Sequence, residues 1–412
     1  MKNKTEGQKI NPLIKIIGPL FLLGPGLIAS TLNNDASGLV VLAKLGQTSG
    51  LNLLWFLVPM IICLIVTLEM ALRLGIATGK GLADLIREQF GAKITFYSFA
   101  ILLFADFLNT TAELSGVAMA GELLGIDRAI FVPIVSLLMI VLITKGDYKV
   151  LEKLLVFGSL LLILFVITLV FEVKDWSSIG RGLGRPTLDQ LSRQNLTYLF
   201  ALVGTTVTPW MVFYFQSSVV EKRLKVDDIR KGKLDIILGG LTVFIIAISI
   251  IVLTASRELL SNDLNFFKSY SQVFAPMLGK NSEIIFALLL LNASLFSAIL
   301  LPLAASYYIC EGLGLPSGLD NNIDEAPHFF GIIIGILLLS STVVLFTKSG
   351  LLKILIGSQL FNGMLVPLIL FFLLKLCNDQ ELMGVHTNNT ATNIFYGLFL
   401  LLLITTSLAA FI

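Results

Sequence analysis

The chain has 412 residues, of which 56% are hydrophobic and only 14% are charged, and its formal net charge is +2. A soluble domain carries roughly 25% charged residues, so the composition excludes an ordinary soluble protein and indicates an integral membrane protein. The near-balanced charge gives no case for a nucleic-acid partner. Three scattered cysteines, Cys63, Cys310 and Cys377, predict neither a disulfide framework nor a zinc site.

The charged residues separate apolar runs that are long enough to cross a bilayer. Because lipid offers the backbone no hydrogen-bond partners, such runs must be helices. We therefore predict an all-α membrane protein with about 11 transmembrane helices in one domain, 13–411, after a short N-terminus, 1–12. The expected segments are 13–46, 51–77, 94–123, 129–144, 150–173, 195–219, 235–256, 283–311, 328–346, 351–376 and 393–411.

The first and sixth segments are interrupted at matching places. The first contains Asn-Asn-Asp-Ala-Ser-Gly at 33–38, and the sixth contains Gly-Thr-Thr-Val-Thr-Pro at 204–209. If 13–173 and 195–376 are repeats with an odd number of helices each, they must insert with opposite orientation. Paired interruptions in inverted repeats mark the central site of a secondary transporter. We therefore predict a 5+5 inverted repeat with broken helices 1 and 6 and an extra helix at 393–411.

Asp35 lies within the first interruption, where a carboxylate costs about 2.5–3.5 kcal/mol on insertion scales. It is tolerated there only if it is paired, hydrated or bound to a cation. Gly38 and the Gly-Pro-Gly at 24–26 favour an unwound backbone whose carbonyl oxygens can face a cation, and Asn34 adds an amide oxygen. The alternative is that Asp35 simply caps a half-helix, which does not exclude metal binding.

Thr205, Thr206 and Thr208 precede Pro209 in the second interruption. Proline lacks a backbone N–H, so carbonyl groups one turn earlier are left unpaired. Hydroxyl and carbonyl oxygens are hard ligands that suit magnesium, calcium and manganese better than copper or zinc. The alternative is a simple proline kink whose threonines bond back to their own helix.

Further polar side chains fall inside the predicted membrane segments. Asp106 and Glu113 can share one helical face and could line an aqueous path to the site. Asn109, Gln359 and Asn362 are similar candidates for a path or for a second layer around the site. The alternative for all of them is polar contact between helices.

Lys and Arg are unevenly distributed among the loops. With a cytoplasmic N-terminus, the inside loops hold a basic cluster at 222–233 and most other basic residues, although the loop 312–327 is acidic against this trend. The positive-inside rule thus places the N-terminus in the cytoplasm and the C-terminus outside the plasma membrane.

The order and spacing of several motifs resemble the NRAMP-type divalent metal transporters over nearly the whole chain. The resemblance implies a leucine-transporter-like fold, with metal held between broken helices 1 and 6. It also implies that Asp35 matches the metal-binding aspartate of the family. The motifs are GPGLIA at 24–29, NNDASG at 33–38, RLGIATGKGLA at 73–83, TTAELSG at 110–116, YKVLEKL at 148–154, KLD at 233–235, LAASYYICEG at 303–312 and ELMG at 381–384.

The departures from the family pattern point to a different metal. The family's metal-binding methionine falls at Thr208, and the asparagine of its first motif falls at Gly38. A thioether discriminates against magnesium and calcium, so its replacement by a hydroxyl removes that discrimination. A smaller ligand set leaves room for the waters that magnesium retains. The chain therefore resembles the magnesium-carrying branch related to the family.

Proton coupling is expected to be weak or absent. The family's histidine after the second break falls at Trp210, and the aspartate of its third helix falls at Thr110, while the glutamate is kept as Glu113. A central proton relay would have to run on carboxylates without histidine, the side chain that usually titrates near neutral pH.

The first interpretation is a transporter of partly hydrated Mg²⁺ that tolerates Mn²⁺. Asp35, the Thr205 carbonyl and the Thr208 hydroxyl are the expected ligands, with the Leu32 carbonyl and Asn34 as further candidates. The alternatives are a proton-coupled Mn²⁺ or Fe²⁺ importer, or an amino-acid or organic-cation symporter of the same fold, whose anionic substrate Asp35 would repel. The sequence contains neither an HExxH nor a GxSxG motif, which would indicate an enzyme. The expected partners are the metal ion as substrate and the lipid bilayer, with no cofactor and no obligate protein partner.

Overall fold

The computed structural model describes residues 34–145, 158–187, 191–255, 257–319 and 321–411. These residues form helices joined by short loops, and no strand occurs among them. The main helices are α3 (Ala36–Ser49), α4 (Leu57–Thr78), α5 (Leu82–Leu123), α6 (Arg128–Lys145), α8 (Ile163–Glu172), α10 (Arg193–Thr206), α11 (Pro209–Glu221), α12 (Ile229–Thr254), α15 (Ser282–Leu313), α16 (Pro327–Phe346), α17 (Leu351–Cys377) and α19 (Thr390–Phe411). The predicted all-α architecture is confirmed.

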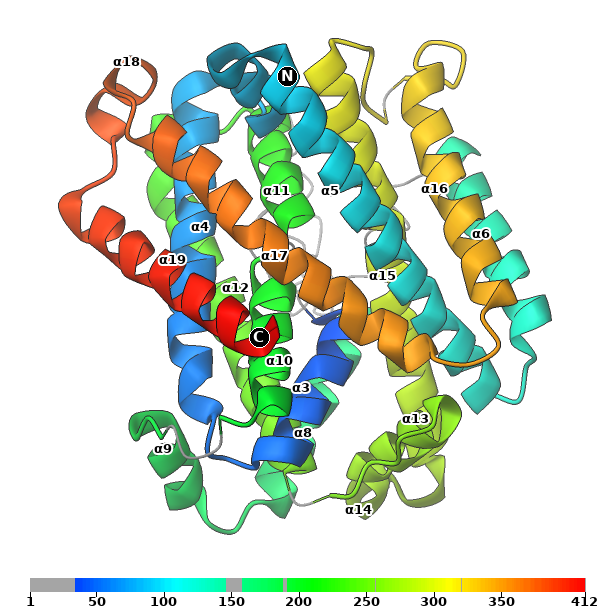
Figure 1. Ribbon diagram of the computed structural model, residues 1–412. Helices are drawn as coiled ribbons and strands as arrows, with labels where there is room; N and C mark the ends of the chain where they lie inside the picture. Colours follow the sequence, from blue (N-terminus) through cyan, green and yellow to red (C-terminus); the bar gives the residue numbers. More distant parts are fainter. Residues whose placement is uncertain (1–33, 146–157, 188–190, 256, 320, 412) are drawn as a thin grey trace, which may run out of the picture.

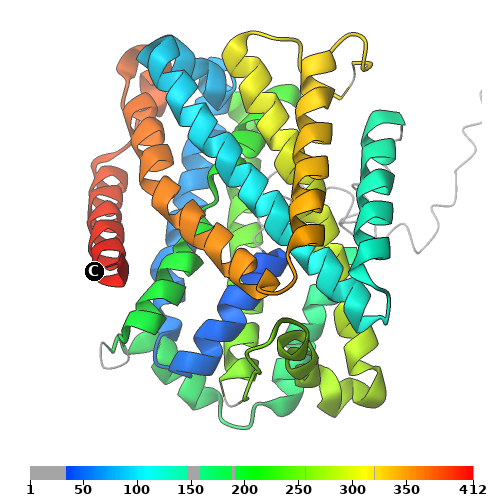
Figure 2. The ribbon, with the colours of Figure 1, turned by 45° about the vertical axis from the view of Figure 1, so that its right-hand side comes forward.

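Eight helical stretches of the described chain are long and apolar enough to cross a membrane, and two shorter apolar helices accompany them. They agree with the expected segments, apart from the beginnings of the first and fifth segments, which lie outside the described residues. Short helices cover the ends of the bundle in Figure 1: α9 (Trp176–Gly184), α13 (Asp263–Ser271) and α14 (Ala275–Leu278) at the lower end, and α18 (Gln380–Met383) at the upper end. Helix α19 lies at the edge of the bundle (Figure 2).

Helix α5 begins twelve residues earlier than the predicted segment 94–123, at Leu82. The added turns contain Asp84, Arg87 and Glu88, whose charges made this stretch look like a loop. Gly91 then takes a left-handed conformation (φ 80°) that bends the helix between its polar beginning and its apolar body. The sequence therefore placed the apolar part correctly and missed the polar turns that precede it.

The helices that flank the two breaks run in opposite directions. Helix α3 leads away from the first break, whereas α10 leads toward the second, yet the two helices pack against each other. Both lie in the lower half of Figure 1, with α11 above them. This antiparallel packing is what two repeats of opposite orientation require.

Candidate metal site at the two helix breaks

Asp35 occupies the start of α3. Its backbone is extended (φ −67°, ψ 169°), and its Oδ1 accepts a hydrogen bond of 2.6 Å from the Gly38 N–H, which makes it the N-cap of the helix. The side chain is buried. Within the described part of the chain, no lysine, arginine or histidine forms an ion pair with it. The predicted capping role is confirmed, and among the described residues no hydrogen bond to Oδ2 is found.

Glu113 reaches the same helix end from α5. Its carboxylate accepts hydrogen bonds from the Ala36 N–H (3.1 Å), the Ser37 N–H (3.4 Å) and the Ser37 hydroxyl (2.7 Å). The first three amides of α3 are therefore satisfied by two acidic side chains. The start of a helix carries a partial positive charge, which would oppose a cation, and Glu113 offsets it. The sequence predicted Glu113 near the path but did not indicate this contact.

The second break separates α10 from α11. Val207 (φ −119°, ψ 72°) leaves the helical conformation, and Thr208 is extended, before Pro209 begins α11. Because Pro209 has no N–H, the Thr205 carbonyl lacks its helical partner. The predicted interruption at 204–209 is confirmed.

Several buried polar atoms near the breaks have no hydrogen-bond partner within the described chain. They are both amide atoms of Asn34 and the hydroxyls of Thr205, Thr208 and Ser294. Thr206 differs, because its hydroxyl bonds back to the Leu202 carbonyl at 2.7 Å, as the kink interpretation expected. Buried polar groups are normally paired, so these unpaired atoms are candidates to bind an ion or a water molecule.

Ser294 on α15 was not predicted. A methyl group on Gly116 of α5 would collide with the Ser294 hydroxyl and would lie 2.7 Å from Cβ of Ala36. The hydroxyl thus sits beside the first turn of α3. Nothing in the sequence places this serine near the first break, and only the packing of α3, α5 and α15 brings it there.

The other predicted polar residues join α5 to α15 and α17. Asn109 of α5 and Asn362 of α17 exchange hydrogen bonds (2.8 and 3.1 Å), and Asn362 also donates to Gln359 at 3.1 Å. Asp106 accepts a hydrogen bond of 2.9 Å from the Tyr308 hydroxyl of α15. All five side chains are buried and join helices to one another. A role for them in an ion path stays a prediction, and Leu32 lies outside the described residues.

Gly204 allows α10 and α17 to approach each other closely. A Cβ at this position would collide with the Gln359 carbonyl oxygen and would lie 2.6 Å from the Gly363 nitrogen, and both atoms belong to the backbone. Backbone atoms cannot move aside as a side chain does. This close contact fixes α10 beside α17 just before the break at Val207.

We expect Gly204→Ala to lower the free energy of unfolding by about 3 kcal/mol, because the added methyl forces α10 away from α17. Thermal unfolding in detergent measures the effect. Gly357→Ala on α17 is the matched control, since nothing lies within 4 Å of its Cβ position. Equal melting temperatures for the two variants would contradict the close contact.

The two breaks contribute one buried carboxylate, that of Asp35, and several neutral oxygens. No group of three or more His, Cys, Asp or Glu side chains that could hold a metal occurs in the described ranges. The arrangement therefore differs from a closed structural metal site. A hard cation that keeps part of its hydration shell suits such a set.

The comparison with known proteins identifies the family of the chain. The family model described as natural resistance-associated macrophage protein-like (Nramp) matches residues 26–412. The chain belongs to the Nramp family. This confirms the resemblance, and the Nramp chain is a multi-pass membrane protein.

Named relatives of this Nramp chain are transporters, and the expectation that it is not an enzyme agrees with them. A protein from Yersinia pestis, named divalent metal cation transporter MntH, is 26% identical over 410 residues, which cover 95% of this chain and 94% of that protein. A protein of the same name from Pectobacterium carotovorum is 25% identical and covers 90% of this chain and 88% of its own length.

Solved structures share the fold. A manganese transporter from Eremococcus coleocola superposes with a TM-score of 0.77 at 17% identity, covering 98% of this chain and 88% of that one. A nucleobase-cation-symport-1 family transporter gives a TM-score of 0.54 at 16% identity, covering 85% and 77%. At these identities the likeness concerns the fold alone, and it confirms the predicted transporter fold with broken helices.

Proposed function

We propose that this Nramp protein carries divalent metal ions, with magnesium preferred and manganese tolerated, and that the ion sits partly hydrated between the two helix breaks. The observation that carries the proposal is Asp35, a buried carboxylate without a cationic partner in the described chain. It starts a helix that packs against α10, and the unpaired hydroxyls of Thr205 and Thr208 lie at the end of α10 and just after it. The names of the MntH relatives support a divalent cation as cargo.

The ligand chemistry supports a hard cation. The side chains proposed as ligands at the breaks offer oxygen only, from Asp35, Asn34, Thr205 and Thr208. Magnesium prefers oxygen ligands and gives up its waters reluctantly, so buried hydroxyls that lack partners suit its retained waters. Ser294 is a further hydroxyl that we assign to this hydrated shell.

The start of α3 favours a cation over an anion. In a symporter for a carboxylate substrate, free amides at a half-helix start bind the anion. Here the amides of Ala36, Ser37 and Gly38 already donate to Glu113 and Asp35. An anionic substrate would meet two carboxylates in place of free N–H groups, which argues against the amino-acid symporter.

Transport in liposomes tests the proposal. We expect purified protein to move Mg²⁺ and Mn²⁺, with no acidification of the lumen as reported by an enclosed pH dye. Transport of iron or cadmium without magnesium would overturn the metal assignment. Acidification coupled to metal entry would support the proton-coupled importer.

We keep the cytoplasmic N-terminus as part of the proposal, and accessibility labelling of the basic segment at 222–233 checks it.

Thr208→Met tests the ligand set. A thioether adds a soft ligand, so we expect the preference for Cd²⁺ over Mg²⁺ to rise about tenfold, equivalent to about 1.4 kcal/mol. Competition between the two ions in the uptake assay measures it. Thr242→Met on α12 is the matched control, because the Thr242 hydroxyl bonds to its own helix at Leu238. The same shift in ion preference in both variants would show that Thr208 is not a ligand of the site.

A further inference from the structure

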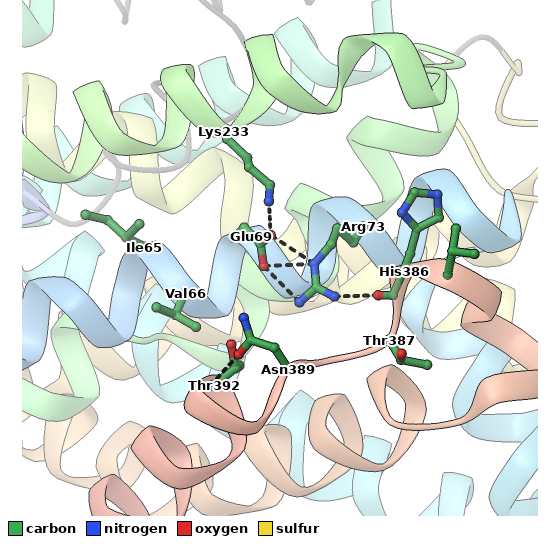
Figure 3. Close-up of a pocket in the computed structure, with 10 residues that line it drawn as sticks. Ile65, Val66, Glu69, Arg73, Lys233, His386, Thr387, Asn389 and Thr392 are labelled. Atoms are coloured by element: carbon green, nitrogen blue, oxygen red, sulfur yellow. Dashed lines mark hydrogen bonds and ion pairs between the residues drawn. The ribbon is translucent and has the colours of Figure 1, made fainter.

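A polar cavity lies away from the helix breaks. It has a volume of about 390 Å³ and lies between α4, α12 and the segment that joins α18 to α19 (Figure 3). We call it the Arg73 pocket. Its lining consists of charged and polar side chains together with apolar ones from α4 and from the segment before α19. They are Ile65, Val66, Glu69, Arg73, Lys233, Val385, His386, Thr387, Asn389 and Thr392.

The Arg73 pocket holds two permanent cations and one carboxylate. Glu69 forms ion pairs with Arg73 (2.9 Å) and with Lys233 (2.6 Å). Arg73 is further committed, since it donates to the His386 carbonyl and to the Asn388 side chain. Lys233 is the available cation: its side chain is 44% exposed, and Glu69 occupies only part of its three-donor ammonium group. The pocket therefore has a net positive charge that an anion would balance.

The depth of the Arg73 pocket matches the headgroup region of a membrane. Lys233 lies four residues from the beginning of α12 at Ile229, or about 6 Å along the helix axis. Arg73 lies five residues before the end of α4 at Thr78. The basic residues Arg230 and Lys231 continue past the pocket toward the end of the bundle.

Apolar stripes lead away from the Arg73 pocket along the elements that border it. On α12 the stripe follows Lys233 at helical spacing, and similar exposed stripes run along α4 and α19. The exposed residues of the three stripes are Leu234, Ile237, Leu238, Leu241 and Ile245 on α12, Val58 and Ile62 on α4, and Ile394, Leu398 and Leu401 on α19. In a membrane protein such faces meet the acyl chains of lipids. A polar cavity at the end of these stripes suits a molecule with a charged head and apolar tails.

We propose that the Arg73 pocket binds the phosphate of an anionic phospholipid, whose acyl chains lie along the stripes of α4 and α12. The single excess positive charge matches one phosphodiester. A zwitterionic headgroup would add a cation, and Glu69, the carboxylate of the pocket, is already paired twice. A glycerol headgroup can instead hydrogen-bond to the hydroxyls of Thr387 and Thr392.

Native mass spectrometry of the full chain tests this site. The protein is released from nanodiscs that contain equal amounts of phosphatidylglycerol and phosphatidylcholine. We expect phosphatidylglycerol to be retained preferentially and Lys233→Gln to reduce its retention about fivefold, as the loss of about 1 kcal/mol predicts. Lys233→Arg should restore it, which separates loss of charge from loss of fold.

Lys231→Gln is the matched control, because it removes the same charge two residues away at a side chain outside the pocket lining. Equal losses for Lys231→Gln and Lys233→Gln would mean a general attraction to the surface and would overturn the site. A second arm adds inorganic phosphate to delipidated protein. Lys233-dependent phosphate binding without preferential lipid retention would identify free phosphate as the ligand and would also overturn the proposal. Neither arm depends on metal transport.

Discussion

Asp35→Asn is expected to reduce the affinity for Mg²⁺ and Mn²⁺ about 100-fold while the protein still folds. Asparagine caps a helix about as well as aspartate, so the hydrogen bond from Gly38 can persist. The substitution removes the negative charge that we assign to the metal, and a loss of about 2.8 kcal/mol corresponds to that factor. Calorimetry of metal binding measures the affinity, and uptake into liposomes should fall with it.

Asp175→Asn provides the matched control. Asp175 also caps a helix, accepting from the Ser177 N–H at 3.0 Å at the start of α9, but it is exposed and far from the breaks along the chain. We expect unchanged metal affinity for this variant. Unaltered metal binding by the Asp35→Asn variant would show that Asp35 is not the principal ligand and would overturn the proposed site.

The main features of the fold could be predicted from the sequence because lipid restricts the backbone conformations of a membrane-spanning chain. Apolar runs must be helical, which placed most of the spanning helices to within a few residues but missed the polar start of α5. A proline without an N–H marked the break at Pro209. A lone carboxylate inside an apolar segment marked Asp35. Each of these signals is local, and each depends on the cost of placing a polar group in hydrocarbon.

Features that depend on contacts between distant segments could not be predicted. Glu113 accepts hydrogen bonds from amides that lie 77 and 76 residues before it, and no local pattern predicts a contact over that separation. Ser294 belongs to a helix in the second half of the chain. Glu69 and Arg73 form a local pair four residues apart on α4, but Lys233 and the His386 carbonyl join it only in the folded protein.

The two acids at the start of α3 have different duties in the proposed mechanism. One oxygen of Asp35 accepts a hydrogen bond from Gly38, and we assign the carboxylate to the ion. The Glu113 carboxylate instead accepts hydrogen bonds from Ala36 and Ser37. Glu113 therefore acts through α3, by holding the half-helix in place and by offsetting the positive end of its dipole. Stability and ion affinity should respond differently when its side chain is shortened or only made neutral.

Glu113→Ala is expected to lower the free energy of unfolding by about 3 kcal/mol, because the buried amides of Ala36 and Ser37 and the Ser37 hydroxyl lose their acceptor. Glu113→Gln keeps one acceptor oxygen and should lose only about 1 kcal/mol. Both variants remove the charge that offsets the start of α3, so both should weaken metal binding to a similar degree. Thermal unfolding and calorimetry on the same preparations separate the two effects.

Glu122→Ala on the same helix is the control for this pair. Glu122 is partly exposed and lies 3.7 Å from Arg128, and a pair of this kind contributes at most about 1 kcal/mol. If Glu113→Ala unfolded at the temperature of Glu122→Ala, the three hydrogen bonds at α3 would carry no stability. If Glu113→Gln bound metal as tightly as the unmodified protein, the negative charge of Glu113 would not be needed to offset the positive start of α3. Asp35 alone would then account for the attraction of the ion.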